Sequence, residues 1–185
     1  MADSRNGELG WYLPKYRGII EPERFHIPRR LAKTIRQRRF RVTVNIAFAD
    51  VIRACAEPAP GREDTWISDE IIALYQELHD TGFAHSIECW QGGKLVGGLY
   101  GIAIRGLFAG ESMFSRTRDA SKVALVELVQ RLRAGGFTLL DTQFYTPHLG
   151  QFGAIEIPDE AYQVRLQRAL MTDARFPVGS LFDGG

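Results

Sequence analysis

Two polar side chains, Asp141 and Gln143, end an otherwise apolar stretch at residues 135–143. Side chains alternate between the two faces of a β-strand, so residues two positions apart point the same way. We therefore expect Asp141 and Gln143 to lie side by side on one face of a strand. A carboxylate beside an amide can accept a hydrogen bond from the amide NH2 group, which leaves the amide oxygen facing a donor such as an amine. The alternative is a polar strand end with two solvated side chains.

The segments around this pair predict separate runs of strands and helices. A strand meander precedes the long apolar helix that leads to Asp141, and one more helix follows, which is the order of an α+β fold and not of repeated βαβ units. Ser68 and Asp119 are predicted N-caps. In chain order we expect a strand at residues 41–45, helices at 48–55 and 68–82, strands at 84–91, 95–104 and 107–114, a helix at 119–132, a strand at 139–141, a loop at 148–153 and a helix from Pro158.

The composition indicates one folded domain in a reducing compartment. A chain of 185 residues, of which 45% are hydrophobic, can bury a full core. Cys55 and Cys89 fit no disulfide or zinc pattern, and the four histidines show no metal spacing. No apolar run approaches the roughly 20 residues of a membrane span, and the N-terminus has no signal-peptide pattern. We expect a soluble, cytoplasmic protein without a membrane partner.

A basic segment stands out against the net charge of +1. Eight lysine and arginine residues, and no acidic residue, lie between Arg24 and Arg41, so the rest of the chain is net negative. If Pro28 occupies the first turn of a helix, Arg29, Lys33 and Arg36 share one face of it. Like charges at this spacing repel one another, so helix stability does not explain them. The segment predicts a polyanion-binding face, and the alternative is a solvated basic surface.

Seven short segments, in order and at consistent spacing, resemble a known family. They are Thr65-Trp66-Ile67, His85-Ser86-Ile87-Glu88, the glycine-rich residues 95–101, Gly-Glu-Ser-Met-Phe-Ser-Arg at 110–116, Ala120-Ser121-Lys122, Leu-Asp-Thr-Gln at 140–143 and Phe-Gly-Ala-Ile-Glu-Ile-Pro at 152–158. The run at 110–116 is the most specific of them. Together they resemble the leucyl/phenylalanyl-tRNA–protein transferases, bacterial enzymes that tag protein N-termini for degradation.

The resemblance implies both a fold and a reaction. The fold would be acetyltransferase-like (GNAT), in agreement with the predicted α+β order. The reaction would move leucine, phenylalanine or methionine from aminoacyl-tRNA to a protein or peptide with N-terminal arginine or lysine. Because an ester becomes an amide, the transfer would need no metal, nucleotide or other cofactor. The enzyme would have to position the amine, manage its proton and stabilise the oxyanion.

The resemblance also implies which residues form the site. The family's catalytic pair corresponds to Asp141 and Gln143. Since a neutral amide is a very weak base, Gln143 would orient the attacking amine while Asp141 polarises it. Trp66 corresponds to a tryptophan that stacks on the terminal adenine of the tRNA, and its alternative role is that of a core anchor. Glu111 corresponds to a carboxylate that contacts the aminoacyl-adenosine end.

Further residues would bind the donor. Ser115 is predicted among the substrate-binding residues, and the amino-acid side chain would enter an apolar pocket. The positions that correspond to this pocket are Tyr75, Leu99, Phe108, Met113, Leu125 and Leu128. Most of these side chains would serve equally well as ordinary core residues. The tRNA acceptor stem would be held by its phosphates at a cluster that corresponds to Arg29, Lys33 and Arg36.

One part of the chain departs from the family pattern. Family members normally begin with a further N-terminal domain that carries a Gly-Ile-Phe-Pro-Trp element, and this chain has only Trp11-Tyr12-Leu13-Pro14 in its place. We expect residues 1–16 to be a poorly ordered remnant of that domain and residues 17–185 to be the catalytic domain.

Two other functions remain open at this point. The first is an acyl-CoA-dependent N-acyltransferase, since the fold is shared. That class needs a glycine-rich turn before a helix N-terminus, whereas residues 115–119 contain two arginines and no glycine. The second is a non-catalytic tRNA-binding module. The presence of Asp141, Gln143 and Glu111 speaks against it.

Overall fold

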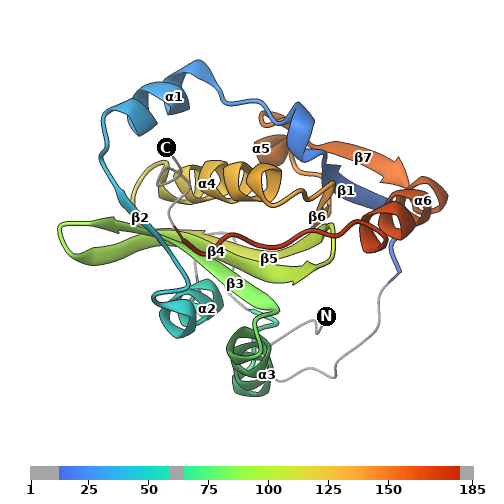
Figure 1. The fold of residues 1–185 in the computed structure, drawn as a ribbon. Coiled ribbons are helices and arrows are strands. Elements are labelled where there is room, and N and C mark those ends of the chain that lie inside the picture. Colours follow the sequence, from blue (N-terminus) through green and yellow to red (C-terminus); the bar gives the residue numbers. More distant parts are fainter. Residues whose placement is uncertain (1–12, 59–64, 180–185) are drawn as a thin grey trace.

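In the part of the chain that the computed structural model describes, residues 13–58 and 65–179, seven strands form one mixed sheet (Figure 1). The strands are β1 (Tyr16–Ile20), β2 (Arg41–Val44), β3 (Ala84–Gln91), β4 (Lys94–Ile104), β5 (Leu107–Ser115), β6 (Leu139–Gln143) and β7 (Ile155–Pro158). Their order across the sheet is β2-β3-β4-β5-β6-β1-β7. Neighbouring strands are antiparallel except β5 and β6, which run parallel.

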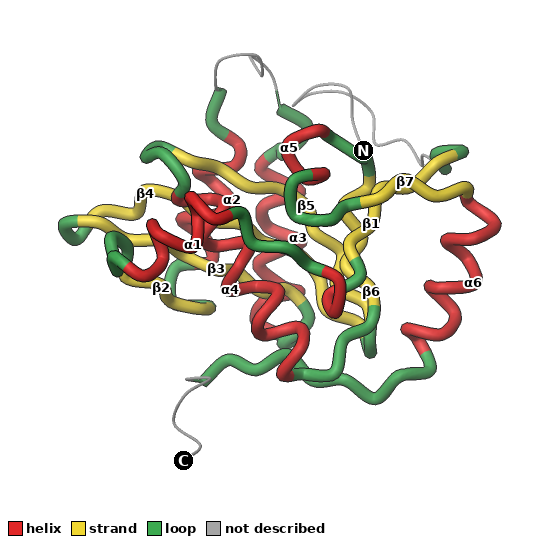
Figure 2. Tube along the Cα trace, turned by 90° about the horizontal axis from the view of Figure 1, so that it is seen from above, coloured by secondary structure: helices red, strands yellow, loops and turns green. Residues whose placement is uncertain are grey.

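Helices cover both faces of this sheet. They are α1 (Arg29–Arg36), α2 (Phe48–Ala56), α3 (Asp69–Asp80), α4 (Ala120–Ala134), α5 (Pro147–Gly150) and α6 (Asp159–Leu170), with a short 3-10 helix η1 (Pro22–Arg24). The long helix α4 crosses one face, and α2 and α3 lie on the other (Figure 1). Seen from above, α6 lies at the end of the sheet beside β7 (Figure 2). None of the described helices is long and apolar enough to cross a membrane.

Most of the predicted elements are confirmed. The α+β order is correct, β3 has the predicted bounds, and Gly92 and Gly93 take positive φ angles of 58° and 76° in the hairpin turn that follows it. Ser68 caps α3 by accepting a hydrogen bond from the Ile71 N–H. The expected N-terminal remnant lies mostly outside the described residues, although β1 already begins at Tyr16.

Three expectations of local structure were wrong or incomplete. Asp119 precedes α4 but does not cap it, because its left-handed backbone (φ 70°) directs the carboxylate toward Lys122 instead. The hydroxyl of Ser115 accepts the Ser121 N–H at 3.3 Å in its place. Part of the loop predicted at 148–153 belongs to α5, where the Thr146 side chain caps the helix. The strands β1 and β7 were not predicted.

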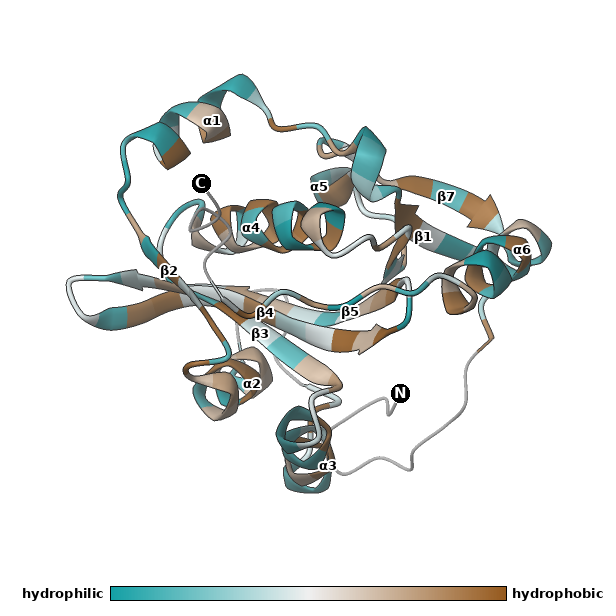
Figure 3. Cartoon of the chain, in the orientation of Figure 1, coloured by the Kyte–Doolittle hydropathy of each residue, from teal (hydrophilic) through white to brown (hydrophobic). Residues whose placement is uncertain are grey.

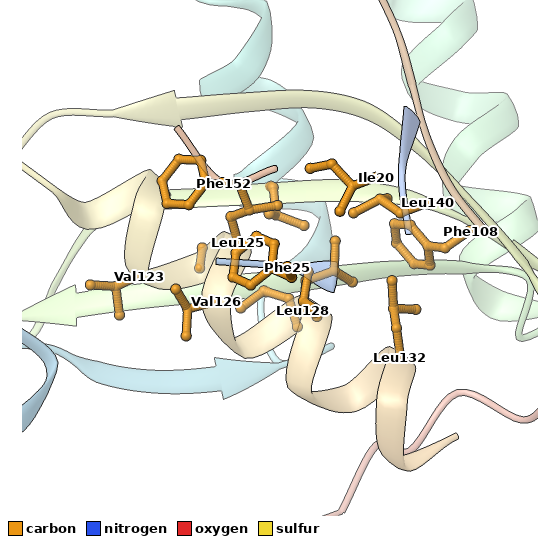
Figure 4. Packing of buried hydrophobic residues seen from close by; sticks show 14 of the residues in the cluster. Ile20, Phe25, Phe108, Val123, Leu125, Val126, Leu128, Leu132, Leu140 and Phe152 are labelled. Atoms are coloured by element: carbon orange, nitrogen blue, oxygen red, sulfur yellow. The ribbon is translucent and has the colours of Figure 1, made fainter. Parts of the chain in front are cut away.

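The main core lies between α4 and the sheet. Figure 4 shows its buried side chains, which come from α4, from the strands and from the loop that carries Phe152. Each fully buried aliphatic side chain contributes about 1.5–3 kcal/mol relative to an exposed one. The first turn of α4 packs so closely on β4 that a Cβ added at Gly97 would lie 2.5 Å from the Ala120 Cβ. The glycine-rich strand is therefore a close-packing surface for this helix.

The C-terminal segment closes one end of this core. Phe176 stacks on His85 with a centroid distance of 4.2 Å and also contacts Phe108. Arg131 of α4 holds the segment by donating to the Pro177 and Gly179 carbonyl oxygens at 2.6 and 2.8 Å. The chain thus crosses the end of the sheet after α6 and is fixed there by both ring contacts and hydrogen bonds.

A buried polar cluster joins β2 to β3 on the far side of the sheet from β7. The fully buried Glu88 carboxylate accepts hydrogen bonds from the hydroxyls of Thr43 and Ser86, each at 2.5 Å. The Thr43 hydroxyl in turn accepts the Trp90 indole N–H at 2.7 Å. Since a buried polar group without a partner is costly, these contacts fix the register of the edge strand.

We expect Thr43→Val to lower the free energy of unfolding by about 1–3 kcal/mol, because it leaves the buried Glu88 carboxylate and the Trp90 N–H short of a partner. Urea unfolding of the variant and the parent protein measures this loss. Thr34→Val is the matched control, since Thr34 makes only a hydrogen bond to the Arg30 carbonyl on the exposed side of α1, and should stay within about 0.5 kcal/mol of the parent. Equal stability of both variants would refute the proposed role of this cluster.

Candidate active site

A cavity of about 250 Å³ opens where β5 and β6 run parallel under α4. Its wall is mostly apolar, with polar groups on the side formed by β5 and β6. The lining residues are Leu99, Tyr100, Gly110, Glu111, Ser112, Met113, Leu125, Leu128, Leu140, Thr142, Thr146, His148 and Leu149. Drug-sized ligands generally occupy pockets of about 300–1,000 Å³, so this cavity suits a smaller group such as one amino-acid side chain.

Asp141 lies in β6 directly behind this cavity and is only 5% exposed. One carboxylate oxygen accepts the backbone N–H of Gln143 at 2.7 Å. The other accepts the Tyr162 hydroxyl at 2.7 Å and lies 3.6 Å from an Arg17 guanidinium nitrogen. The carboxylate is therefore held by two hydrogen bonds and one ion pair, from three parts of the chain.

Gln143 ends β6 in the left-handed region, with φ of 63°, so strand alternation does not extend to its side chain. Its NH2 group donates to the Glu111 carboxylate at 3.0 Å and lies 3.5 Å from the Gly110 carbonyl oxygen. The expectation that Asp141 holds the Gln143 NH2 group was wrong. Asp141 holds the Gln143 backbone, and Glu111 of the neighbouring strand holds the amide.

Glu111 is the carboxylic acid among the residues that line the cavity. Burial raises the pKa of its carboxyl above the ordinary value, and the nearby charge of Asp141 adds to this effect. Hydrogen bonds from Tyr75 and Gln143 lower the pKa and partly offset the burial. Burial, followed by the influence of Glu111, also raises the pKa of the Tyr75 hydroxyl, so Tyr75 remains a neutral donor.

The chain that follows Gln143 passes unusually close to β1. A Cβ added at Gly18 would lie 2.3 Å from the Phe144 carbonyl carbon and 2.5 Å from the Tyr145 nitrogen. Only glycine leaves room for this crossing. Gly18 is paired with Gln143 across β1 and β6, next to an irregularity in the strand register. The close approach therefore helps to hold Gln143 where the strand turns toward the cavity.

The structure brings together some of the predicted pocket residues. Leu99, Met113, Leu125 and Leu128 line the cavity with Glu111. Phe108 is fully buried in the main core and does not line it.

Tyr75 and Ser115 lie apart from the cavity wall as well. Tyr75 approaches from α3, where its ring meets the cavity residue Tyr100 edge to face at 5.3 Å. Ser115 stands at the end of β5, and its hydroxyl organises the turn before α4 by donating to the Thr117 carbonyl oxygen. Their predicted roles in binding the substrate remain predictions.

Trp66 is half-buried and packs against a second core cluster, which lies on the α2 and α3 side of the sheet. The cluster includes Tyr100, whose side chain also borders the cavity. Its partial exposure is compatible with a stacking surface, but packing alone would also account for its position. Its role in adenine binding stays a prediction.

The basic face of α1 is present as expected. Arg29, Lys33 and Arg36 are all exposed, while Leu31 is buried and Ile35 packs against the main core. Figure 3 shows the hydrophilic colour over most of this helix. No acidic residue lies in its first turn, and the ion pairs found among residues 13–58 and 65–179 include none of these three side chains.

Several residues of the site were not found from the sequence. Arg17 and Tyr162 contact Asp141 although they lie far from it in the chain. Thr142 could have been noticed beside the predicted pair, whereas Thr146 and Leu149 reach the cavity through the unpredicted α5 region. Among the described residues, no group of three or more His, Cys, Asp or Glu side chains is arranged to hold a metal ion.

The fold has a counterpart among solved structures. The structure of L-PGS from Bacillus licheniformis superposes with a TM-score of 0.51 over 84% of this chain and 67% of that chain, at 12% sequence identity. At this identity the likeness concerns the fold alone.

Sequence comparison identifies close relatives. The chain is 59% identical over 177 residues to the leucyl/phenylalanyl-tRNA–protein transferase of Phenylobacterium zucineum, which covers 95% of this chain and 80% of the relative. It is 57% identical to that of Gluconobacter oxydans, over 95% and 78% of the two chains. It is 55% identical to that of Herpetosiphon aurantiacus, over 92% and 88%.

The family model described as leucyl/phenylalanyl-tRNA protein transferase matches residues 19–167, which include β6, the cavity and the basic helix. With most of the chain matched by this model and by relatives above 50% identity, the chain belongs to the leucyl/phenylalanyl-tRNA–protein transferase family.

Proposed function

We propose that this protein transfers leucine, phenylalanine or methionine from aminoacyl-tRNA to proteins with N-terminal arginine or lysine, and thereby marks them for N-degron proteolysis. The family membership supports the class of reaction. The observation that carries the proposal in this chain is the Glu111–Gln143 hydrogen bond at the polar side of an apolar cavity of about 250 Å³. It combines a pocket for an apolar side chain with polar groups for the reacting atoms.

The fold and its setting form part of the same proposal. We assign residues 17–185 to an acetyltransferase-like (GNAT) catalytic domain, on the basis of the mixed sheet with helices on both faces. We assign the protein to the cytoplasm, where charged tRNA is found. Cys55 and Cys89 are both buried and form no disulfide bond within residues 13–58 and 65–179, which fits a reducing compartment.

The reaction exchanges one bond at the carbonyl carbon. The acceptor's α-amine attacks the ester carbonyl, a C–N bond forms, and the bond from that carbon to the ribose oxygen breaks. The proton lost by the amine is finally needed on the departing ribose oxygen, so the site must guide it between the two. Since no external energy source is required, orientation and proton transfer are the tasks left to the protein.

Gln143 and Glu111 fit these tasks. Because the NH2 group of Gln143 is committed to Glu111, its amide oxygen is left to accept an N–H from the attacking amine. The carboxylate of Glu111 fixes the amide and is a cavity-lining group that can exchange a proton. Asp141 contributes through the Gln143 backbone, which it holds in the left-handed conformation.

An aminoacyl-tRNA donor fits the start of α4 better than an acyl-CoA donor does. A pyrophosphate would need free N–H groups at that helix terminus. Here the Ser115 hydroxyl accepts the Ser121 N–H, and Ala120 packs against Gly97. Arg116, in the same turn, forms a bidentate pair with Glu57 at 2.6 and 2.7 Å. The basic face of α1 offers phosphate contacts elsewhere.

The direct test of this function is transfer of labelled leucine or phenylalanine from charged tRNA to a peptide that begins with lysine or arginine. An otherwise identical peptide with an acetylated N-terminus is the control, because it lacks the nucleophile. Absence of transfer to the free peptide under conditions where a related transferase is active would refute the proposal.

In this assay we expect Gln143→Ala and Asp141→Asn to lower the transfer rate roughly 100-fold or more, since misplacing a reacting group by about 1 Å can cost that much. Affinity for aminoacyl-tRNA should change little, because neither side chain is needed to hold the donor. Gln163→Ala is the matched control, as this glutamine bonds only to Asp159 on α6. Wild-type turnover by both site variants would remove them from the mechanism.

For the adenine contact, we expect Trp66→Ala to weaken binding of an aminoacyl-adenosine analogue by roughly 1–3 kcal/mol, the usual contribution of base–aromatic stacking. Trp66→Phe should retain most of the affinity. Both variants should remain folded by circular dichroism. A loss of folding without a selective loss of binding would identify Trp66 as a core residue only.

For the basic helix, we expect affinity for tRNA to fall linearly with the logarithm of salt concentration because binding releases counterions. Replacing Arg29, Lys33 and Arg36 with alanine should flatten that slope by roughly 0.7–0.9 for each phosphate that is no longer neutralised. Transfer from a minimal aminoacyl-adenosine donor should be unchanged, since that donor has no acceptor stem.

The control for this experiment removes three exposed arginines from other elements: Arg53, Arg105 and Arg168. This triple variant changes net charge equally but should leave most of the slope in place. Equal slopes for the two triple variants would mean that α1 is only a solvated basic surface.

A further inference from the structure

One carboxylate oxygen of Asp141, Oδ2, is contacted by residues of α6 and β1. Neither of these two elements borders the cavity. Tyr162 lies in the first turns of α6 and is 4% exposed, and its hydroxyl donates to Asp141 at 2.7 Å. Arg17 lies in the middle of β1, where it pairs with Ile157 of β7. Neither residue lines the cavity, so any effect on the reaction must pass through Asp141.

Arg17 and Tyr162 also contact each other. The guanidinium carbon of Arg17 lies 4.6 Å from the centre of the Tyr162 ring, in a cation–π arrangement. Its Nε is buried and has no hydrogen-bond partner within residues 13–58 and 65–179. A buried donor without a partner costs free energy, so helix packing alone is a poor reason for this arginine. The Arg17 guanidinium and the Tyr162 hydroxyl are thus held together beside one carboxylate oxygen of Asp141.

The other oxygen of the same carboxylate leads to the site. It accepts the Gln143 N–H at 2.7 Å, at a residue whose left-handed φ of 63° is unfavourable for a side chain with a Cβ. From there the amide group reaches Glu111 at 3.0 Å. A continuous series of contacts thus connects α6 and β1 to the polar side of the cavity.

We infer that Tyr162 and Arg17 are positioning residues of the transferase: they hold the Asp141 carboxylate so that its second oxygen keeps Gln143 in its left-handed conformation. Asp141 is nearly enclosed, accepts two hydrogen bonds and forms an ion pair with Arg17, which suits a fixed support better than a group that meets substrate. Burial, together with the Asp141 carboxylate, raises the pKa of the Tyr162 hydroxyl, so it remains a neutral donor. The inference rests on the proposed function for its effect on rate.

A purely structural role would have different consequences. The same contacts could serve only to attach α6 to the sheet, which also happens through the apolar cluster around Ile157 and Ala169. Loss of the Tyr162 hydroxyl would then lower stability and leave the turnover number unchanged. A positioning role instead changes the turnover number and the local order of Gln143, while the affinity for the donor stays the same.

The experiment compares Tyr162→Phe with the parent protein in the peptide-transfer assay. The substitution keeps the ring beneath Arg17 and removes only the hydroxyl. We expect kcat to fall roughly 10- to 100-fold, in line with the loss of a hydrogen bond to a charged group, with KM for aminoacyl-tRNA unchanged. Tyr16→Phe is the matched control, since Tyr16 lies on the same strand as Arg17 with a half-exposed ring, and should have the parent rate.

A double-mutant cycle separates this role from general destabilisation. If Tyr162 acts through Asp141, adding Tyr162→Phe to Asp141→Ala should cause no further loss of kcat. If the two side chains acted independently, their separate losses of kcat would multiply in the double variant. Should Tyr162→Phe fail to fold, Arg17→Met, which keeps an unbranched side chain but removes the charge, is compared in the same cycle. An unchanged kcat in the folded variant, or multiplying losses, would overturn the inference.

Hydrogen exchange gives a readout that does not depend on activity. In Tyr162→Phe we expect the Gln143 amide to exchange roughly tenfold faster or more, because a weakened hydrogen bond at its N–H opens more often, while the Leu140 amide of the same strand is unchanged. A parent protein without transfer activity would refute the proposed function and leave this measurement to decide the positioning role. Unchanged protection of the Gln143 amide would refute the positioning role by itself.

Discussion

The buried carboxylate of Asp141 places the strongest constraint on this structure. A carboxylate removed from water must be met by hydrogen bonds or opposite charge, or its burial costs several kcal/mol. Here the hydrogen bonds come from the Gln143 backbone and the Tyr162 hydroxyl, and the opposite charge is the Arg17 guanidinium. Because they belong to β6, α6 and β1, one charge determines how three elements meet. The polar side of the cavity follows from that meeting.

The apolar side of the cavity depends instead on the packing of α4 against the sheet. Leu125 and Leu128 belong both to the main core and to the cavity wall, so the pocket lies at the edge of the main core and shares side chains with it. The distance of α4 from the sheet is fixed partly by Gly97, which admits the first turn of the helix. Changes that enlarge the pocket at these leucines therefore also remove core packing, and acceptance of a larger side chain is linked to stability.

Much of the fold could be predicted because it depends on local patterns. Strand alternation located β3, and the capping serine located the start of α3. The short strands β1 and β7 carry no comparable signal, since each depends on pairing with strands distant in the chain: β1 with β6 and β7, and β7 with β1. In the candidate site, the resemblance pointed to Gln143 and Glu111, which the structure brings together at the cavity, but strand periodicity assigned the wrong partner to the amide. A single left-handed residue was enough to invalidate the alternation.

The position of β1 between β6 and β7 has a consequence for synthesis of the protein on the ribosome. A nascent chain emerges from its N-terminus, so β1 leaves the exit tunnel long before either of its partners exists. At that stage Asp141, the ion-pair partner of Arg17, has not yet been synthesised. Phe144 and Tyr145, which pass close to Gly18, are also still missing. The strand must wait, unpaired, until most of the polypeptide has been made, and such long-range pairing is slow. Transferase activity therefore arises only after β6 and β7 have been made, and β1 stays without its strand partners until then.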